Sequence, residues 1–400
     1  MVFNSYLILV YFLAFIAVYN GVKLISKNIY VRNGLLFLAN LFILLTFVKE
    51  HTIIVLAVFS LLIYFLGRLI SSKSSKGLLA FGLTFVVLLF SFRNYPYLQN
   101  AISSGAMSFI HAPIMSVEKI GLSYILFRYV HWLVESFKGS IHRPNPITFI
   151  NYILFFPSIL AGPIDTYNNF AYWVESSRPR YNRVLFFAGI TRLFLGAFKT
   201  VAIVPLIIVY ATDYTLLLDD FSPAVAIFIN AMIYSAYIYI DFSGYSDIAI
   251  GSSYLIGIRT PENFDSPYIS MNLSSFWKRW HMTFSNFLSL YVFKPVLRLY
   301  NSFINPKHRM LVTILGYLTT FTICGLWHGD TMNFVLWGLW HGIGLSINKV
   351  WTAKLKHKVI KSDTLVYRAS SVLLTFVFVS IGWLFFHYPI DQLTQMYSIL

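Results

Sequence analysis

The sequence predicts an all-α, polytopic integral membrane protein, and its composition, its apolar runs and the placement of its basic residues support that prediction. Of the 400 residues, 58% are hydrophobic and only 11% are charged, whereas a soluble domain carries about 25% charged residues. A spanning helix needs about 20 mostly apolar residues. Candidate runs lie at 4–22, 34–48, 52–71, 77–92, 119–136, 148–163, 184–210, 223–242, 310–327, 331–350 and 369–387. We therefore expect a single integral domain over 1–400 with about eleven transmembrane helices.

The first run is predicted to be a spanning helix rather than a signal peptide. It lies in "MVFNSYLILVYFLAFIAVYNGVKL", which lacks a basic leading region and a clear small-residue cleavage site. The 184–210 run is long enough to hold one or two segments. Several other runs are short, so we expect some of them to be tilted or re-entrant.

Two regions interrupt the apolar pattern. "FFPSILAGPIDTY" (155–167) contains Gly162-Pro163, which predicts a tight turn because proline lacks a backbone donor and restricts the residue before it. Residues 243–305 mix glycine, proline, charge and aromatics. Such backbone is tolerated at membrane depth only where it is buried in protein or lines a cavity. We therefore expect re-entrant or in-plane helices here.

Basic residues in alternate loops predict the orientation. They are Lys23, Lys27 and Arg32, then Arg68, Lys73 and Lys76, then Lys138 and Arg143. These loops are expected on the cytoplasmic side, with the N-terminus and the 93–118 loop outside. Arg178, Arg180 and Arg183 fall on the nominal outer side, and a re-entrant segment near Gly162-Pro163 would accommodate them.

The charge balance and the single cysteine exclude several classes of protein. The 30 Lys and Arg against 15 Asp and Glu give a net charge of +15. In a membrane protein this excess indicates loops facing anionic lipid, with the bilayer rather than nucleic acid as the partner. Cys324 alone rules out an intrachain disulfide and a Cys-based zinc cluster, and no His, Cys and carboxylate group has metal-ligand spacing, so no metal is expected.

The stretch "FWKRWH" (276–281) places cationic and aromatic residues together in this apolar chain. Lys278, Arg279 and His281 alternate with Trp277 and Trp280. An in-plane interfacial helix with tryptophan anchors explains the pattern without any chemistry. Such a helix could also close the mouth of a tunnel and direct His281 inward.

The stretch "CGLWHGDTMNFVLWGLWHG" (324–342) contains His328 and His341. An ionisable residue within a membrane is costly and marks a candidate functional site. Neutral imidazole both donates and accepts a hydrogen bond, so His328 has the properties of a general base. His341 follows thirteen positions later, about 19 Å along a continuous helix. It would share a site with His328 only if the helix breaks, so a structural or interfacial role is expected.

Two aspartates and one acidic loop complete the polar features. Asp241 and Asp247 lie in an apolar segment, where pairing with Arg or Lys, or helix capping, explains them. Asn263 lies in the proline-flanked loop "RTPENFDSPYIS" (259–270). No G-x-S-x-G, H-E-x-x-H, Walker or G-x-G-x-x-G pattern is present.

Taken together, the motifs resemble the membrane-bound O-acyltransferase family over about 119–350. In order they are "FFPSILAGPID", "DFSGYSDIAIG", "PENFDSPYIS", "FWKRWHMT" and "GLWHG" twice. The chain looks like the bacterial branch that acylates alginate or teichoic acids. "SDIAIG" and "RTPENF" resemble acetylating members, while "GPIDTYNNF" and "WHMTF" resemble D-alanylating ones, so both acyl groups remain open.

The resemblance implies a mechanism and a set of site residues. His328 would be the catalytic base and His281 its partner across a central tunnel, orienting the acyl group or stabilising the oxyanion. Lys278 and Arg279 would bind donor phosphates. The remaining candidate substrate-binding residues are Trp277, Trp327, Asp247 and Asn263.

The resemblance also implies substrates, partners and a location. The donor would be acetyl-CoA or an acyl-phosphopantetheine carrier protein on the cytosolic side, with no bound cofactor. An extracytoplasmic acyltransferase would be a further partner, and the location would be the bacterial cytoplasmic membrane. The alternatives are a transporter or flippase of an acyl carrier or lipid-linked intermediate, with the histidines as a proton relay, and a scaffold for a separate acyltransferase.

Overall fold

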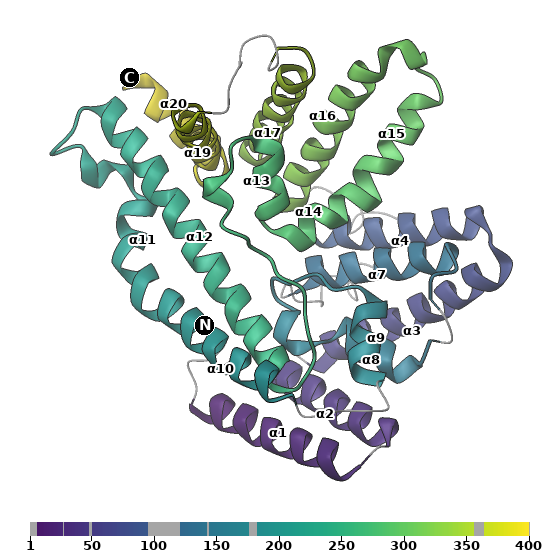
Figure 1. Ribbon diagram of the computed structural model, residues 1–400. Helices are drawn as coiled ribbons and strands as arrows, with labels where there is room; N and C mark the ends of the chain where they lie inside the picture. Colours follow the sequence, from purple (N-terminus) through teal and green to yellow (C-terminus); the bar gives the residue numbers. More distant parts are fainter. Residues whose placement is uncertain are drawn as a thin grey trace. The chain divides into compact units, whose positions relative to one another are not determined.

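The computed structural model describes residues 6–26, 28–47, 50–94, 121–141, 144–175, 182–355 and 364–399. These residues are helical and contain no strand (Figure 1), which confirms the all-α class. The chain clusters into two compact units, one of residues 1–195 and 246–261 and the other of residues 196–245 and 262–400. The single domain expected from the sequence stays a prediction.

The first unit contains most of the N-terminal helices. They are α1 (Tyr6–Ile25), α2 (Ile29–Phe47), α3 (Glu50–Lys73), α4 (Lys76–Asn94), α7 (Leu122–Phe137), α8 (Pro146–Ile153), the 3-10 turn η1 (Phe156–Ser158), α9 (Tyr167–Glu175) and α10 (Arg183–Ala197) as far as residue 195. The last part of α12 (Pro223–Leu255) also belongs here.

The second unit contains the regions singled out as chemically unusual. Its elements are the π-helical segment η2 (Phe198–Ile203), α11 (Val204–Thr212), η3 (Tyr214–Leu217), the first part of α12, η4 (Pro267–Ile269), α13 (Leu273–Arg279), α14 (Met282–Leu288), η5 (Ser289–Phe293), α15 (Lys294–Asn301), η6 (Pro306–His308), α16 (Arg309–His328), α17 (Met332–Val350), η7 (Trp351–Leu355), α19 (Leu365–His387) and α20 (Ile390–Ser398). Within it, α16 and α17 lie side by side (Figure 1).

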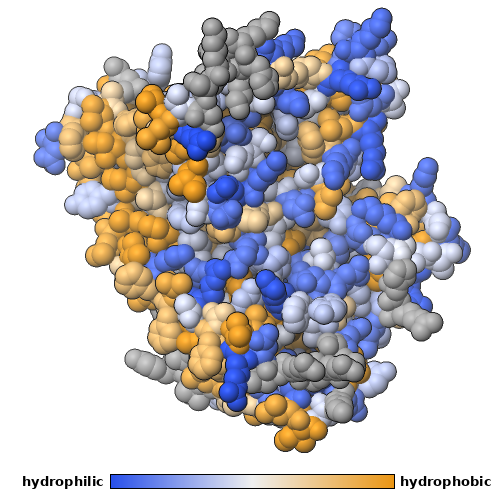
Figure 2. Space-filling view, viewed as in Figure 1, coloured by the Kyte–Doolittle hydropathy of each residue, from blue (hydrophilic) through white to orange (hydrophobic). Residues whose placement is uncertain are grey.

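Six helices of the described chain are long and apolar enough to cross a membrane. They are Ile29–Thr46, Thr52–Lys73, Arg183–Thr212, Pro223–Leu255, Pro306–His328 and Leu365–His387. Shorter apolar helices lie at Tyr11–Ile25, Lys76–Ser91 and Pro146–Ser158. Figure 2 shows hydrophobic residues gathered where α11 lies, and Leu206 there is 75% exposed. The chain is thus a polytopic membrane protein, while the count of about eleven crossings stays a prediction.

The predicted orientation concerns several residues that the structure leaves out. Lys27, Arg143, Arg178 and Arg180, and all but the first two residues of the 93–118 loop, lie outside the described residues. Lys73 is described, at the end of α3. The cytoplasmic placement of the alternate loops stays a prediction.

The 184–210 run, left open as one or two segments, forms one helical stretch from Arg183 to Thr212, continued through the π-helical segment η2. One boundary differs from the sequence prediction. The 223–242 run was expected to end before a mixed region, yet α12 continues to Leu255. The glycines that suggested an interruption are close-packing sites. A Cβ on Gly251 would lie 2.8 Å from the carbonyl oxygen of Gly189, and one on Gly244 would lie 2.8 Å from Cγ2 of Thr200. Glycines in membrane helices commonly permit such close approach.

Arg128 organises the turn that follows α8. Its side chain is 2% exposed and donates to the carbonyl oxygens of Tyr152 and Ile153, both at 2.7 Å. It also donates to the carbonyl oxygen of Ser158 at 3.1 Å and to the hydroxyl at 2.8 Å. A rigid planar donor fork suits several acceptors at once. The carbonyls at the end of this helix are therefore satisfied by a buried side chain rather than by water.

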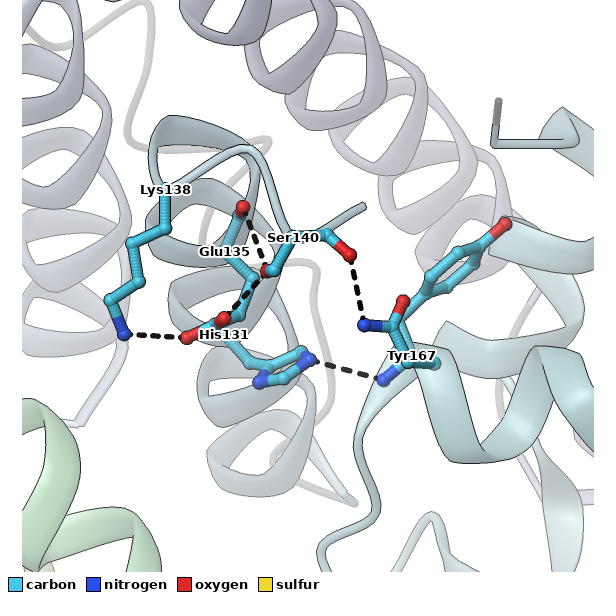
Figure 3. A network of polar contacts seen from close by, with 6 residues as sticks. His131, Glu135, Lys138, Ser140 and Tyr167 are labelled. Atoms are coloured by element: carbon cyan, nitrogen blue, oxygen red, sulfur yellow. Dashed lines mark hydrogen bonds and ion pairs between the residues drawn. The ribbon is translucent and has the colours of Figure 1, made fainter. Parts of the chain in front are cut away.

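A second polar network connects the end of α7 to the start of α9 (Figure 3). The backbone N–H of Tyr167 donates to Nε2 of His131 at 3.1 Å. Glu135 accepts from the Ser140 hydroxyl at 2.6 Å and from Nζ of Lys138 at 2.7 Å. Lys138, one of the basic loop residues, thus pairs with Glu135, and His131 ties α7 to the start of α9.

The predicted tight turn at Gly162 is present. Gly162 has φ of 83°, a left-handed conformation that favours glycine. A Cβ there would lie 3.0 Å from the ring of Tyr124 and 3.2 Å from the backbone nitrogen of Ile164. Backbone conformation and the lack of space therefore both require glycine.

We predict that Gly162→Leu destabilises the protein strongly, with Gly139→Leu as the matched control. Gly139 has φ of 70° but open space around its Cβ position, so the control carries only the backbone strain of about 1–2 kcal/mol. Thermal unfolding in detergent measures both variants. Equal melting temperatures for the two would contradict the requirement for space at Gly162.

Candidate functional site

His281 lies in a sharp turn between two short helices. Helix α13 begins at an Asn272 cap, whose side chain accepts from the backbone N–H of Ser275 at 2.9 Å, and ends at Arg279. Helix α14 begins at Met282. His281 has φ of 41° and is 4% exposed. Left-handed conformation is uncommon for residues other than glycine and persists where the surroundings enforce it.

Helix α13 contains residues 276–279 of "FWKRWH", and the turn after it buries His281 in the unit. The in-plane orientation and the tunnel mouth stay predictions. Two bonds from the preceding loop hold the turn in place. The backbone N–H of Met282 donates to the carbonyl oxygen of Asn263 at 2.8 Å, and that of Asp265 donates to the carbonyl oxygen of Arg279 at 3.0 Å.

Asn263 also fixes the tautomer of His281. Its Oδ1 lies 3.2 Å from Nδ1 of His281 and accepts from the Thr283 hydroxyl at 2.6 Å. Because an amide oxygen only accepts, Nδ1 of His281 carries the proton. Burial, with a smaller contribution from nearby His328, lowers the pKa of His281 to about 3. The ring is therefore neutral at physiological pH, and its Nε2 is an acceptor.

His328 lies close to His281 with the ring of Phe284 in contact with both. The centroid of Phe284 is 5.0 Å from that of His281 and 6.2 Å from that of His328. His328 is the last residue of α16 and is partly exposed. Trp327 packs on Phe284 at 4.7 Å. His281 from the first sequence stretch, Trp327 and His328 from the second, and Phe284 of α14 are thus brought together within the second unit.

The continuous helix assumed between His328 and His341 breaks. Gly329 is extended, and α17 begins only at Met332. The two helices pack against each other, so both histidines contact Trp337, with ring centroids 5.0 Å and 5.2 Å away. His341 is fully buried. Because the helix breaks, the separation expected for a continuous helix does not apply, and the structural or interfacial role of His341 stays a prediction.

The remaining candidate residues occupy different surroundings. Trp277 is 9% exposed and packs on His341 at 5.0 Å. Lys278 is exposed. Arg279 donates to the carbonyl oxygen of Asp265 at 3.3 Å and lies 3.8 Å from its carboxylate. The side chain of Lys278 is thus exposed, whereas that of Arg279 contacts the loop that contains Asp265.

Asp247 belongs to the first unit, whereas His281 and His328 belong to the second. The Asp247 carboxylate pairs with Arg192. Pairing with an arginine or lysine was one explanation of this aspartate from the sequence. Its substrate-binding role stays a prediction. Asp241, six residues earlier, belongs to the second unit and is exposed.

The sequence reasoning missed Phe284 and Trp337 as site residues. Aromatic residues are common in both helices, so neither residue type stood out. The sequence indicated a place near the site only through position, because Phe284 follows His281 by three residues and Trp337 follows His328 by nine. Among the described residues, no three His, Cys, Asp or Glu lie close enough to hold a metal ion.

Fold and site together define a polytopic membrane protein in which a buried histidine, His281, lies close to a partly exposed one, His328. A family model for the membrane-bound O-acyltransferase family matches residues 37–390. The chain belongs to that family.

The chain is similar to several curated bacterial proteins. It is 34% identical over 230 residues to a teichoic acid D-alanyltransferase of Bacillus subtilis (strain 168), covering 55% of this chain and 56% of that protein. It is 30% identical over 284 residues to a probable alginate O-acetylase AlgI of Azotobacter vinelandii, covering 70% and 53%. It is 27% identical over 300 residues to a peptidoglycan O-acetyltransferase of Helicobacter pylori, covering 67% and 53%. The chain thus spans about half the length of these relatives.

We predict that Asn263→Leu destabilises the protein by roughly 2–4 kcal/mol, because two buried donors lose their acceptor. Thr283→Val is the control, since it removes one hydroxyl and leaves the acceptor of His281 in place. Its cost should be about 1 kcal/mol. Unfolding in detergent measures both, and an effect of Asn263→Leu no larger than that of Thr283→Val would contradict the anchoring of His281 by Asn263.

Proposed function

We propose that the protein is a membrane-bound O-acyltransferase that moves an acyl group from a cytosolic thioester to a hydroxyl group on the outer side. The observation that carries this proposal is the pair His281 and His328, which meet across Phe284. Membership of the O-acyltransferase family supports the reaction class. Two imidazoles close together can hold and move one proton without a permanent charge in the apolar unit.

The reaction needs a base, and His328 is the better candidate. The hydroxyl oxygen attacks the thioester carbonyl carbon, and a C–O bond forms while the hydroxyl proton passes to His328. The C–S bond then breaks, and the leaving sulfur takes that proton. General-base catalysis of this kind typically contributes about 10²–10⁴-fold. The partial exposure of His328 supports this role, because a base must be reached by the reacting hydroxyl.

Of the two roles considered for His281, orienting the acyl group or stabilising the oxyanion, the hydrogen bond to Asn263 supports an orienting role. With its proton on Nδ1 and bound to Asn263, the neutral ring presents Nε2 as an acceptor. It can therefore hold a donor group of the substrate, such as a hydroxyl or an amide N–H. We propose that His281 orients a substrate while His328 takes the proton, which makes proximity a large part of the rate enhancement.

The donor is proposed to carry a phosphopantetheine thioester. Lys278 is exposed and Arg279 partly so, and cationic side chains suit phosphate groups. Acetyl-CoA and an acyl carrier protein both present this group. We propose no bound cofactor, and the tryptophans Trp277 and Trp327 would line the approach to the histidines.

The acyl group is proposed to be acetyl or D-alanyl, and the acceptor a cell-envelope polysaccharide or teichoic acid. Relatives named for both reactions support this range. The proposed location is the bacterial cytoplasmic membrane, with an extracytoplasmic acyltransferase as a partner. Mass analysis of envelope polymers from cells with and without the protein decides between the groups, because either an acetyl or a D-alanyl ester is lost. Loss of neither ester would overturn the proposal.

We predict that His328→Ala abolishes acyl transfer and that His281→Ala costs nearly as much. If both act in one transition state, the double variant should lose little more than His328→Ala alone. His281→Gln should retain part of the activity, because its amide oxygen still accepts a hydrogen bond. His328→Gln should not, because an amide does not take up a proton.

Transfer should be measured in membranes at equal protein levels, with the exposed His308→Ala as the control. Wild-type activity in His328→Ala would remove the proposed base and would favour a scaffold for another acyltransferase. Fully multiplicative losses would place the two histidines in separate steps. Ion-dependent movement of the acyl carrier without ester formation would favour a transporter.

A further inference from the structure

His341 is a buried polar residue that the proposed reaction does not use. It is 0% exposed, and neither of its ring nitrogens has a hydrogen-bond partner among the described residues. The indole nitrogens of Trp277 and Trp337, which pack on it, also have none there. Buried polar groups are normally hydrogen-bonded, so a cluster of unbonded nitrogens calls for a specific explanation.

The geometry around His341 is edge-to-face. Its ring makes an angle of 87° with that of Trp277 at 5.0 Å and of 65° with that of Trp337 at 5.2 Å. In such contacts the positive edge of one ring meets the negative face of the other. An imidazole N–H is a more polar edge than a C–H, so it holds an indole face more firmly than phenylalanine would.

Each of these two tryptophans is connected to one histidine of the candidate site, Trp337 by a ring contact with His328 and Trp277 through the helix before His281. Trp337 meets the ring of His328 edge-to-face, at 5.0 Å and 87°. Trp277 lies in α13, the helix that ends two residues before His281. His341 therefore contacts both the ring that restrains His328 and the helix that delivers His281.

We propose that His341 is a positioning residue, which fixes Trp277 and Trp337 and thereby sets the ring of His328 relative to His281. This inference rests on the proposed function of the two histidines. Neither nitrogen of His341 touches the reacting groups in this scheme. An apolar ring at this position would avoid the free-energy cost of burying unbonded nitrogens. In this proposal the imidazole contributes instead a polar N–H edge that contacts the indole faces.

The proposal predicts opposite effects of His341→Phe on stability and on turnover. Phenylalanine keeps the ring and removes the unbonded nitrogens, so the variant should melt at the same or a higher temperature. Its kcat for acyl transfer should fall roughly 10- to 100-fold, as expected for a small misplacement of a reacting group. KM for donor and acceptor should stay unchanged, because no substrate contact is lost.

His387→Phe is the matched control. His387 lies in α19 of the same unit, packs on Tyr234 at 4.6 Å and has Nε2 3.1 Å from the carbonyl oxygen of Thr212. The substitution is chemically identical, but the residue does not belong to the cluster around Trp337. We expect a melting temperature no higher than wild type and a kcat per folded protein close to wild type.

A double variant tests whether His341 acts through Trp337. If it does, His341→Phe combined with Trp337→Phe should lose little more kcat than the worse single variant. Multiplicative losses would overturn this route. Full activity in His341→Phe would overturn the role of the nitrogens, and a raised KM at unchanged kcat would show a binding site instead.

One assay separates this inference from the proposed function. Membranes with wild type, His328→Ala, His341→Phe and His387→Phe are given labelled acetyl-CoA or D-alanyl carrier protein, whichever the wild type uses. Activity in His328→Ala would overturn the proposed function. An inactive His328→Ala together with a fully active His341→Phe would overturn only the positioning role.

Discussion

The site depends on one asparagine in the loop before α13. Asn263 uses its backbone carbonyl to hold Met282 and its side-chain oxygen to hold His281 and Thr283. These bonds enforce a left-handed histidine between two helices that would otherwise join into one. In this turn the ring of His281 packs on Phe284, which also contacts His328. A residue expected to bind substrate thus has a demonstrable role in building the site.

Composition and the cost of burying polar groups made the fold class and the two histidines predictable. His281 and His328 stand out because imidazoles in apolar surroundings are rare and costly. The tautomer of His281 was not predictable, since it depends on Asn263, eighteen positions earlier and across a turn. Phe284 and Trp337 were not predictable either, because aromatic residues in apolar helices usually serve as packing.

Some glycines and aspartates allowed more than one structural interpretation from the sequence. Tertiary contacts show which interpretation holds for each glycine and which partner one aspartate has. Gly244 and Gly251 suggested an interruption after residue 242, but they allow neighbouring helices to approach, and α12 continues through them. Gly162 and Gly329, in contrast, do mark breaks. Asp247 pairs with Arg192, 55 residues away in the chain, while its substrate-binding role stays a prediction.

Among the described residues, aromatic rings pack on both histidines, and such surroundings suit the proton transfer proposed for them. Rings of Phe284, Trp327 and Trp337 restrict the imidazoles by shape and by edge-to-face contact. A carboxylate next to either histidine would favour the imidazolium and would make proton uptake from a hydroxyl less useful. The hydrogen bond to the neutral amide of Asn263 leaves Nε2 as the acceptor nitrogen of the His281 ring. The same low-dielectric surroundings strengthen each hydrogen bond that a substrate forms there, so the aromatic enclosure serves both the positioning of the histidines and the chemistry proposed for them.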